Sequence, residues 1–136
     1  MRKIAVLMTA VAFMVSACAS ASPVIDVAHN SYNSLDWAGV YTGTIPAADG
    51  PGIIATITLR YDLTYTVSYQ YIGRQGGDFA LAGTFKWNKE GSSITLDTKN
   101  IPPYYRVGEN RLIQLDMAGK PITGKLAANY MLIKQQ

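Results

Sequence analysis

Residues 37–59, WAGVYTGTIPAADGPGIIATITL, form two alternating runs joined by a connector that is rich in proline and glycine. Within each run every second residue is apolar or glycine, and threonine is the commonest residue between them. A repeat of two residues is the period of a β-strand, in which successive side chains point to opposite faces. The stretch therefore predicts a β-hairpin whose inward residues are Trp37, Gly39, Tyr41, Gly43 and Ile45 in the first strand, and Ile53, Ala55, Ile57 and Leu59 in the second.

The rest of the chain continues as short alternating runs. The clearest is the tyrosine-rich run from Tyr65 to Tyr71, and others are expected at 81–87, 94–96, 104–107, 112–115 and 126–134. No segment of useful length has the 3.6-residue period of a helix. About eight short strands predict an all-β antiparallel meander, and closing it into a small β-barrel would remove the exposed strand edges. A β-sandwich is the alternative, because periodicity alone does not separate the two folds.

Residues 1–17 have the organisation of a signal peptide. Arg2 and Lys3 form a basic start, an apolar run follows at 4–15, and small residues lead to Cys18. The apolar run is shorter than the roughly 20 residues that a membrane-spanning helix needs. The segment VSAC resembles a bacterial lipobox, which implies that Cys18 carries acyl chains such as palmitate and becomes the first residue of the mature protein. The alternative is an ordinary cleavage site that leaves Cys18 as a free thiol.

Residues 18–36 predict a lipid-anchored flexible tether, because they are rich in Ala, Ser and Asn without a sustained period. Acyl chains on Cys18 would hold the protein on a membrane. Ala19 and Ser20 follow the cysteine where an Asp would be typical of inner-membrane lipoproteins, which implies anchoring in the outer membrane. His29, the single histidine of the chain, lies in this tether and is expected to be solvated.

The charge and the scattered polar residues favour neither nucleic-acid binding nor catalysis. Without the signal peptide, ten basic residues stand against nine acidic ones, which is too balanced for a nucleic-acid partner. The carboxylates Asp49, Asp62, Asp97 and Asp116 occur singly at or near turns, and no nucleophile, base or phosphate-binding loop can be assembled around them. We therefore expect no enzyme activity, no cofactor and no metal site.

Several segments occur in an order that is typical of one protein family. They are WAGVYTGTIPAADGPGI, RYDLTYTVSYQY, GTFKW, PYYRVGENRLIQLD and GKPITG. In this order they resemble the N-terminal domain of the NlpE family of outer-membrane lipoproteins. The resemblance implies a lipocalin-like β-barrel over residues 37–136, and a role linked to copper resistance and to envelope-stress signalling.

The loop after the first predicted strand departs from the pattern of that family. Members usually have Leu-Pro-Cys-x-x-Cys there, and this chain has Ile-Pro-Ala-Ala-Asp-Gly at 45–50. Ala47 and Gly50 thus occupy the two cysteine positions. Cu(I) prefers thiolate and thioether ligands, and beyond the signal peptide the chain offers only Cys18, Met117 and Met131 of that kind. We do not expect copper to bind directly.

The same loop could serve as a recognition element. Pro46 and Pro51 stiffen it, so that Ala48 and Asp49 would be carried on a rigid tip with a low ordering cost. The simpler interpretation is a connector that only turns the chain between two strands.

The sequence favours a non-enzymatic sensor or interaction module in envelope stress or copper homeostasis. It would be tethered by lipid to the outer membrane, face the periplasm, and contact a periplasmic or surface protein. Two alternatives are a small lipocalin-like carrier of an apolar ligand and an inhibitor of a periplasmic hydrolase that acts through the 47–51 loop.

Overall fold

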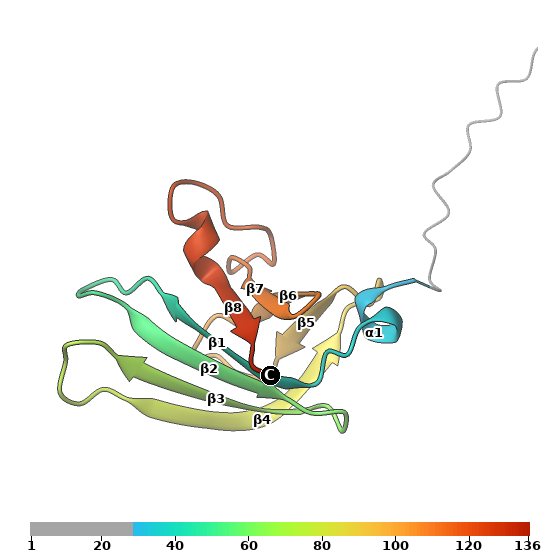
Figure 1. Ribbon diagram of the computed structural model, residues 1–136, viewed down its shortest axis with the longest axis horizontal. Helices are drawn as coiled ribbons and strands as arrows, with labels where there is room; N and C mark the ends of the chain where they lie inside the picture. The colour runs from blue at the N-terminus through green and yellow to red at the C-terminus, as the bar shows by residue number, and fades with distance from the viewer. Residues whose placement is uncertain (1–28) are drawn as a thin grey trace, which may run out of the picture.

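The computed structural model describes residues 29–136, so the predicted signal peptide at 1–17 and Cys18 lie outside the described residues. Within this range a closed antiparallel barrel is formed in which each strand pairs with its neighbour in sequence and β8 returns to β1 (Figure 1). The strands are β1 (Gly39–Ile45), β2 (Ile53–Leu59), β3 (Thr64–Tyr71), β4 (Phe79–Trp87), β5 (Ser93–Leu96), β6 (Tyr104–Gly108), β7 (Arg111–Gln114) and β8 (Met131–Lys134). The predicted all-β barrel of about eight strands is confirmed, and the sandwich alternative is wrong.

The hairpin at the start of the barrel has the faces that its alternation predicts. β1 and β2 pair over their whole length, from Gly39 opposite Leu59 to Ile45 opposite Ile53. Tyr41 and Ile57 face each other in this register and are fully buried. Because inward residues alternate with outward ones, most of them threonines, along both strands, one wall of the core follows directly from the sequence.

The two halves of the barrel differ in strand length. β1 to β4 have seven to nine residues each, whereas β5 to β8 have four or five. The strand predicted at 126–134 is half wrong, because β8 begins only at Met131 and a 3₁₀ helix, η1 (Ala127–Tyr130), precedes it. Backbone bonds from Ala127 N to Gly124 O and from Asn129 N to Leu126 O close these turns locally, which keeps the segment from joining the sheet.

The last part of the predicted tether is packed against the barrel. A short helix, α1 (Ser31–Ser34), is capped at its start by the Asn30 side chain. Ser31 Oγ donates to the Val107 carbonyl over 2.7 Å, and Tyr32 N donates to Gly91 O over 3.0 Å. Residues 31–36 therefore differ from the flexible tether expected there, because an N-cap and an aromatic side chain fix a stretch whose composition is typical of linkers.

Aromatic side chains close the end of the barrel that carries α1. The Tyr32 ring lies 5.4 Å from the Trp87 ring, and the Trp37 ring lies 5.8 Å from Phe85. Trp37 is buried and donates its indole N–H to the Tyr32 carbonyl over 3.2 Å. The loop between β1 and β2 lies at the opposite end of the barrel (Figure 1). No helix among residues 29–136 is long and apolar enough to cross a membrane.

Candidate functional site

The loop between β1 and β2 owes its shape to two prolines and two glycines. Pro46 follows β1 directly and fixes its own φ, and Pro51 does the same near the start of β2. Gly50 and Gly52 have φ values of 105° and 145°. A Cβ on Gly52 would lie 2.9 Å from Thr44 Cγ2 and 3.1 Å from the Ile45 carbonyl oxygen, so only glycine lets the chain return into β2 here.

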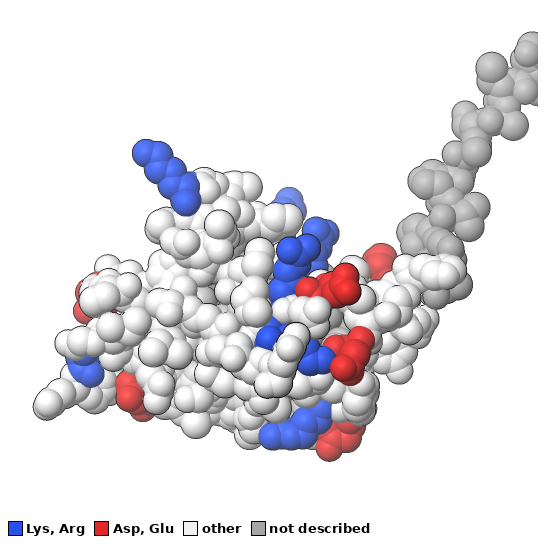
Figure 2. Space-filling model, in the orientation of Figure 1, with Lys and Arg blue, Asp and Glu red and all other residues white. Residues whose placement is uncertain are grey.

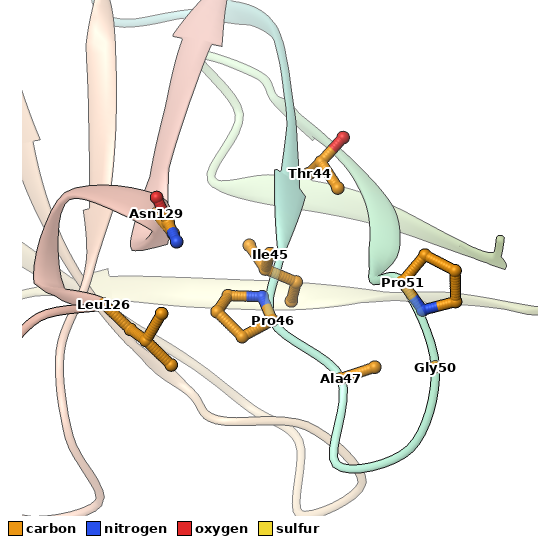
Figure 3. Close-up of a pocket in the computed structure, with 8 residues that line it drawn as sticks. All are labelled: Thr44, Ile45, Pro46, Ala47, Gly50, Pro51, Leu126 and Asn129. Atoms are coloured by element: carbon orange, nitrogen blue, oxygen red, sulfur yellow. The ribbon is translucent and has the colours of Figure 1, made fainter.

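A hollow of about 380 Å³ lies between this loop and the segment before β8 (Figure 3). One side belongs to the end of β1 and the loop, and the other belongs to Leu126 and Asn129 at η1. The hollow is open to solvent, and although most of the residues around it have apolar side chains, polar atoms form the larger part of its surface. The residues that line it are Thr44, Ile45, Pro46, Ala47, Gly50, Pro51, Leu126 and Asn129.

The loop has a half-buried base and an exposed tip. Pro46 and Ala47 are half-buried, and Ala47 packs against the core. Ala48, Asp49 and Pro51 are exposed. The structure thus brings Pro46, Ala47 and Pro51 to the hollow and leaves Ala48 and Asp49 on the outer surface of the tip.

The Asp49 carboxylate has one basic neighbour, from the next hairpin loop on the same rim. Asp49 Oδ1 lies 4.0 Å from Arg74 Nη1, and both side chains are more than half exposed. An ion pair this long and this exposed to water contributes little stability. Arg74 also lies over the Tyr71 ring, 5.2 Å from its centroid. Asp49 is therefore available to a partner at little cost.

The two family cysteine positions lie side by side in the fold. Ala47 and Gly50 both line the hollow, and the Ala47 methyl points across the loop toward Gly50 (Figure 3). Met117 is exposed in a turn, and Met131 begins β8. Within the described range no three residues of the His, Cys, Asp and Glu types group in a way that could hold a metal ion.

Three of the remaining acidic residues hold turns or strand ends. Asp62 Oδ1 accepts hydrogen bonds from Thr64 N and Thr64 Oγ1, over 3.0 and 2.6 Å. Asp116 Oδ1 accepts from the backbone N–H groups of residues 118 and 120, both over 2.9 Å. Asp97 Oδ2 accepts from Thr84 Oγ1 over 3.2 Å. The bonds from Thr64 lower the pKa of Asp62, and the backbone of Thr84, more than its hydroxyl, lowers the pKa of Asp97, so both carboxylates stay ionised.

A polar cluster that the sequence did not indicate lies at the α1 end of the barrel. Tyr61 Oη donates to Asp36 Oδ1 over 2.6 Å, and Lys134 Nζ lies 3.1 Å from Asp36 Oδ2 and also donates to the Asp36 carbonyl. The bond from Tyr61, and then Lys134, lowers the pKa of Asp36, and the bond to Asp36 raises the pKa of Tyr61. The cluster joins Asp36, which precedes β1, to Lys134 on the last strand. Because these partners lie far apart in the sequence, no local sequence pattern predicts their contact.

Charged side chains lie in the loops and on β4, β6, β7 and β8, whereas the wall formed by β1, β2 and β3 contains none. Figure 2 shows this uncharged stretch between the charged groups at the two ends. Its outward residues are mostly threonines, and the Thr42 hydroxyl bonds to the Ala55 carbonyl over 3.1 Å. The loop tip with Asp49 thus carries a charge at the edge of a neutral surface.

Comparison with known proteins gives the same picture of the fold over most of the chain. Residues 41–125 match the model of the NlpE N-terminal domain family. The chain is 30% identical over 93 residues to Lipoprotein NlpE of Escherichia coli strain K12, which covers 68% of this chain and 39% of that protein. The crystal structure of a Shewanella oneidensis protein assigned as a lipoprotein is 43% identical, with a TM-score of 0.72 over 78% of this chain and 95% of that one. The crystal structure of the Cpx pathway activator NlpE from Escherichia coli is 30% identical, with a TM-score of 0.54 over 64% of this chain and 46% of that one.

Proposed function

Because the chain belongs to the NlpE N-terminal domain family, we propose that it is a lipid-anchored protein of the outer membrane that faces the periplasm and acts as a non-enzymatic sensor or interaction module in envelope stress. Cys18 carries the lipid, and the loop at 46–51 contacts a periplasmic or surface protein. The chain spans about two fifths of the length of the Escherichia coli relative, so a link to a pathway of the Cpx type is part of this proposal.

The observation that carries the proposal is the placement of the loop relative to the start of the domain. The described chain begins beside α1, at one end of the barrel, and the 46–51 loop lies at the other end. A lipid anchor that precedes α1 would direct the loop away from the membrane. The stiff loop, its exposed Asp49 and the hollow beside it form a surface that needs little ordering on binding.

In this proposal the protein signals by contact with a partner protein, and not by binding copper. The positions of the family cysteines hold Ala47 and Gly50, which supply no soft ligand. Because both positions line the same hollow, cysteines placed there can be tested by Cu(I) competition titration. We expect the double variant with A47C and G50C to bind Cu(I) much more tightly than the unmodified chain, because it adds two thiolates to one loop. A Cβ on Gly50 meets no atom within 4 Å, so the φ of 105° is the only obstacle to the second cysteine. Equal affinities would show that copper affects the protein in some other way, or not at all.

The proposal is tested with an envelope-stress reporter in the protein's own host. We expect overproduction of the unmodified chain to change the reporter signal. Cys18→Ala should release the protein from the membrane and remove that change. Replacing residues 46–51 with a Gly/Ser segment of equal length should also remove it while the protein stays in the outer membrane.

The control is Glu109→Ala, which alters an exposed turn at the opposite end of the barrel. This variant should behave like the unmodified chain. A reporter that responds equally to the unmodified chain, to Cys18→Ala and to a deletion would overturn the proposal. A loop variant that signals normally would place the contact surface elsewhere.

A further inference from the structure

Aromatic, apolar and basic side chains are exposed together at the end of the barrel that carries α1 (Figure 1). Tyr32 on α1 and Tyr61 in the turn between β2 and β3 are 50% and 67% exposed. Leu63 lies in the same turn as Tyr61 and is 38% exposed. Lys86 near the end of β4 and Lys89 in the following turn are exposed, and neither forms a salt bridge within residues 29–136. We call these five residues the α1-end patch.

Most of the α1-end patch borders a single hollow of about 460 Å³. Apolar atoms form the larger part of its surface, and the two lysines of the patch stand beside them. A hollow of this kind suits a molecule that joins an anionic group to an apolar body. Its lining includes Tyr32, Leu63, Lys86, Trp87 and Lys89.

The two tyrosines of the patch are held in place by the barrel. The Tyr61 ring lies 4.9 Å from the Trp37 ring, and the Tyr61 hydroxyl donates to Asp36 over 2.6 Å. The Tyr32 ring lies 6.3 Å from the Trp37 ring and 5.4 Å from the Trp87 ring. Because both side chains are already ordered, a contact with them costs little conformational entropy.

Leu63 has a backbone conformation that glycine adopts at lower cost. Its φ is 65°, in the left-handed region that bulky residues rarely occupy. The backbone is fixed on both sides, because Leu63 N donates to Arg60 O over 3.0 Å and Leu63 O accepts from Phe85 N over 2.9 Å. The leucine side chain is nevertheless exposed, so the core gains little from it. Strain of this kind at an exposed apolar residue points to a contact outside the molecule.

We propose that the α1-end patch is a membrane-contact surface that lies on anionic phospholipids. Tyrosine rings settle at the boundary between head groups and acyl chains, leucine enters that boundary, and lysines are attracted to negative head groups. The inference rests on the proposed anchor at Cys18. Eleven residue steps lead from Cys18 to His29, and they span at most about 40 Å, so an anchored barrel stays close to the membrane.

The charge of this end is suited to selecting a lipid rather than to holding the barrel by itself. Around the patch, Arg60, Lys86 and Lys89 stand against Asp62 and Glu90. The excess is small, so the apolar side chains and the anchor supply the attachment. The lysines give the contact its preference for anionic lipid.

The test uses the lipidated chain, purified from its host and reconstituted into phospholipid vesicles with or without an anionic lipid. The acyl chains carry bromine near the head groups, and bromine quenches nearby tryptophan fluorescence. The two tryptophans of the chain, Trp37 and Trp87, both contact Tyr32 at this end. We expect quenching that is stronger in the anionic vesicles.

Two variants separate the apolar part of the contact from the charged part. Leu63→Gly should lose most of the quenching without a lower melting temperature, because it removes the side chain and suits the φ of 65°. The double variant K86Q and K89Q should quench in anionic vesicles only as much as in uncharged ones.

Matched controls carry the same changes at the other end of the barrel. Leu126→Ala removes an exposed leucine, and K120Q with K125Q removes two exposed lysines. Both controls should quench as the unmodified chain does. Equal losses in the controls and in the patch variants would overturn the proposal.

Flotation of the protein with the vesicles reports on the anchor separately from the contact. A chain that floats, and whose quenching is unchanged in both patch variants, would overturn the contact surface and leave the anchor standing. Loss of quenching in the leucine variant alone would overturn the preference for anionic lipid. A chain that does not float would overturn both the anchor and the contact.

Discussion

Gly52 illustrates how one residue shapes the candidate site. Its φ of 145° and its close approach to Thr44 and Ile45 turn the chain from the loop back into β2. The PxxxGPG pattern at 46–52 indicates a tight loop from sequence alone. That Gly52 is buried against β1, whereas Gly50 faces open space, depends on how the loop folds back over the strand.

Gly52→Ala should therefore destabilise the protein by about 1–3 kcal/mol, because the new methyl group adds both backbone strain and a clash. Urea denaturation measures the change. Gly76→Ala is the matched control, since Gly76 has a φ of 80° but a Cβ there meets no atom within 4 Å. A loss at Gly76 as large as that at Gly52 would show that backbone strain alone, and not the clash with β1, sets the cost.

The buried Tyr41 makes the free energy of unfolding depend on pH in the alkaline range. Burial, followed by the charges of Asp36 and Tyr61, raises the pKa of Tyr41 to about 12. Between pH 10 and 12 the unfolded chain loses this proton and the folded chain keeps it, so stability is complete below pH 10 and falls as the pH rises, by about 2 kcal/mol.

Tyr41→Phe should reduce the slope of unfolding free energy against pH in that range. It should also lower the stability at neutral pH, because the bond from the hydroxyl to the Trp37 carbonyl is lost. The slope will not vanish, since burial also raises the pKa of Tyr65, Tyr69 and Tyr105. Denaturation at a series of pH values checks this, and an unchanged slope would contradict it.

At the scale of elements, α1 shows what a composition-based prediction misses. Asn, Ser and Tyr in residues 30–34 suggest a linker, and four residues are too few for a helical period. Its position depends on Tyr32, which contacts Trp37 and Trp87. Both tryptophans come later in the sequence, so the segment has a fixed place only once the barrel exists.

Tyr32→Ala should release α1 from the barrel with a loss of about 1–2 kcal/mol, because the aromatic contacts are removed. Hydrogen exchange at residues 31–36 should become faster, while exchange in β2 and β3 stays slow. Leu126→Ala, which also removes a half-exposed apolar side chain but at the other end, should leave exchange at 31–36 unchanged. Unchanged exchange in Tyr32→Ala would mean that the backbone bonds of Ser31 and Tyr32 suffice.

At the scale of the whole molecule, closure depends on the last strand. β8 pairs with β1 through Thr42 and Ile133, and with β7 through Leu112 and Leu132. Leu132 is 1% exposed, so the strand that closes the sheet also adds a side chain to the core. Lys134 adds the bond to Asp36 that ties the end of the domain to its beginning.

A chain that ends after Tyr130 should lose cooperative unfolding, because the edges of β1 and β7 are left open and a buried leucine is missing. Thermal denaturation followed by circular dichroism measures this. A chain that ends after Gln135, and thus keeps β8, should unfold as the full chain does. Cooperative unfolding of the shorter chain at a similar temperature would show that seven strands suffice.

The sequence by itself determined the number and pairing of the strands and the buried face of the long ones, because side chains alternate with a period of two and adjacent strands share short turns. It also indicated the stiff loop and the family. Only the tertiary structure decided that the sheet closes on itself, that 31–36 caps one end, and that Ala47 and Gly50 share a hollow with Leu126. The Asp36–Lys134 contact belongs to this second group. These features depend on contacts between residues that are far apart in sequence, and periodicity reports only on near neighbours.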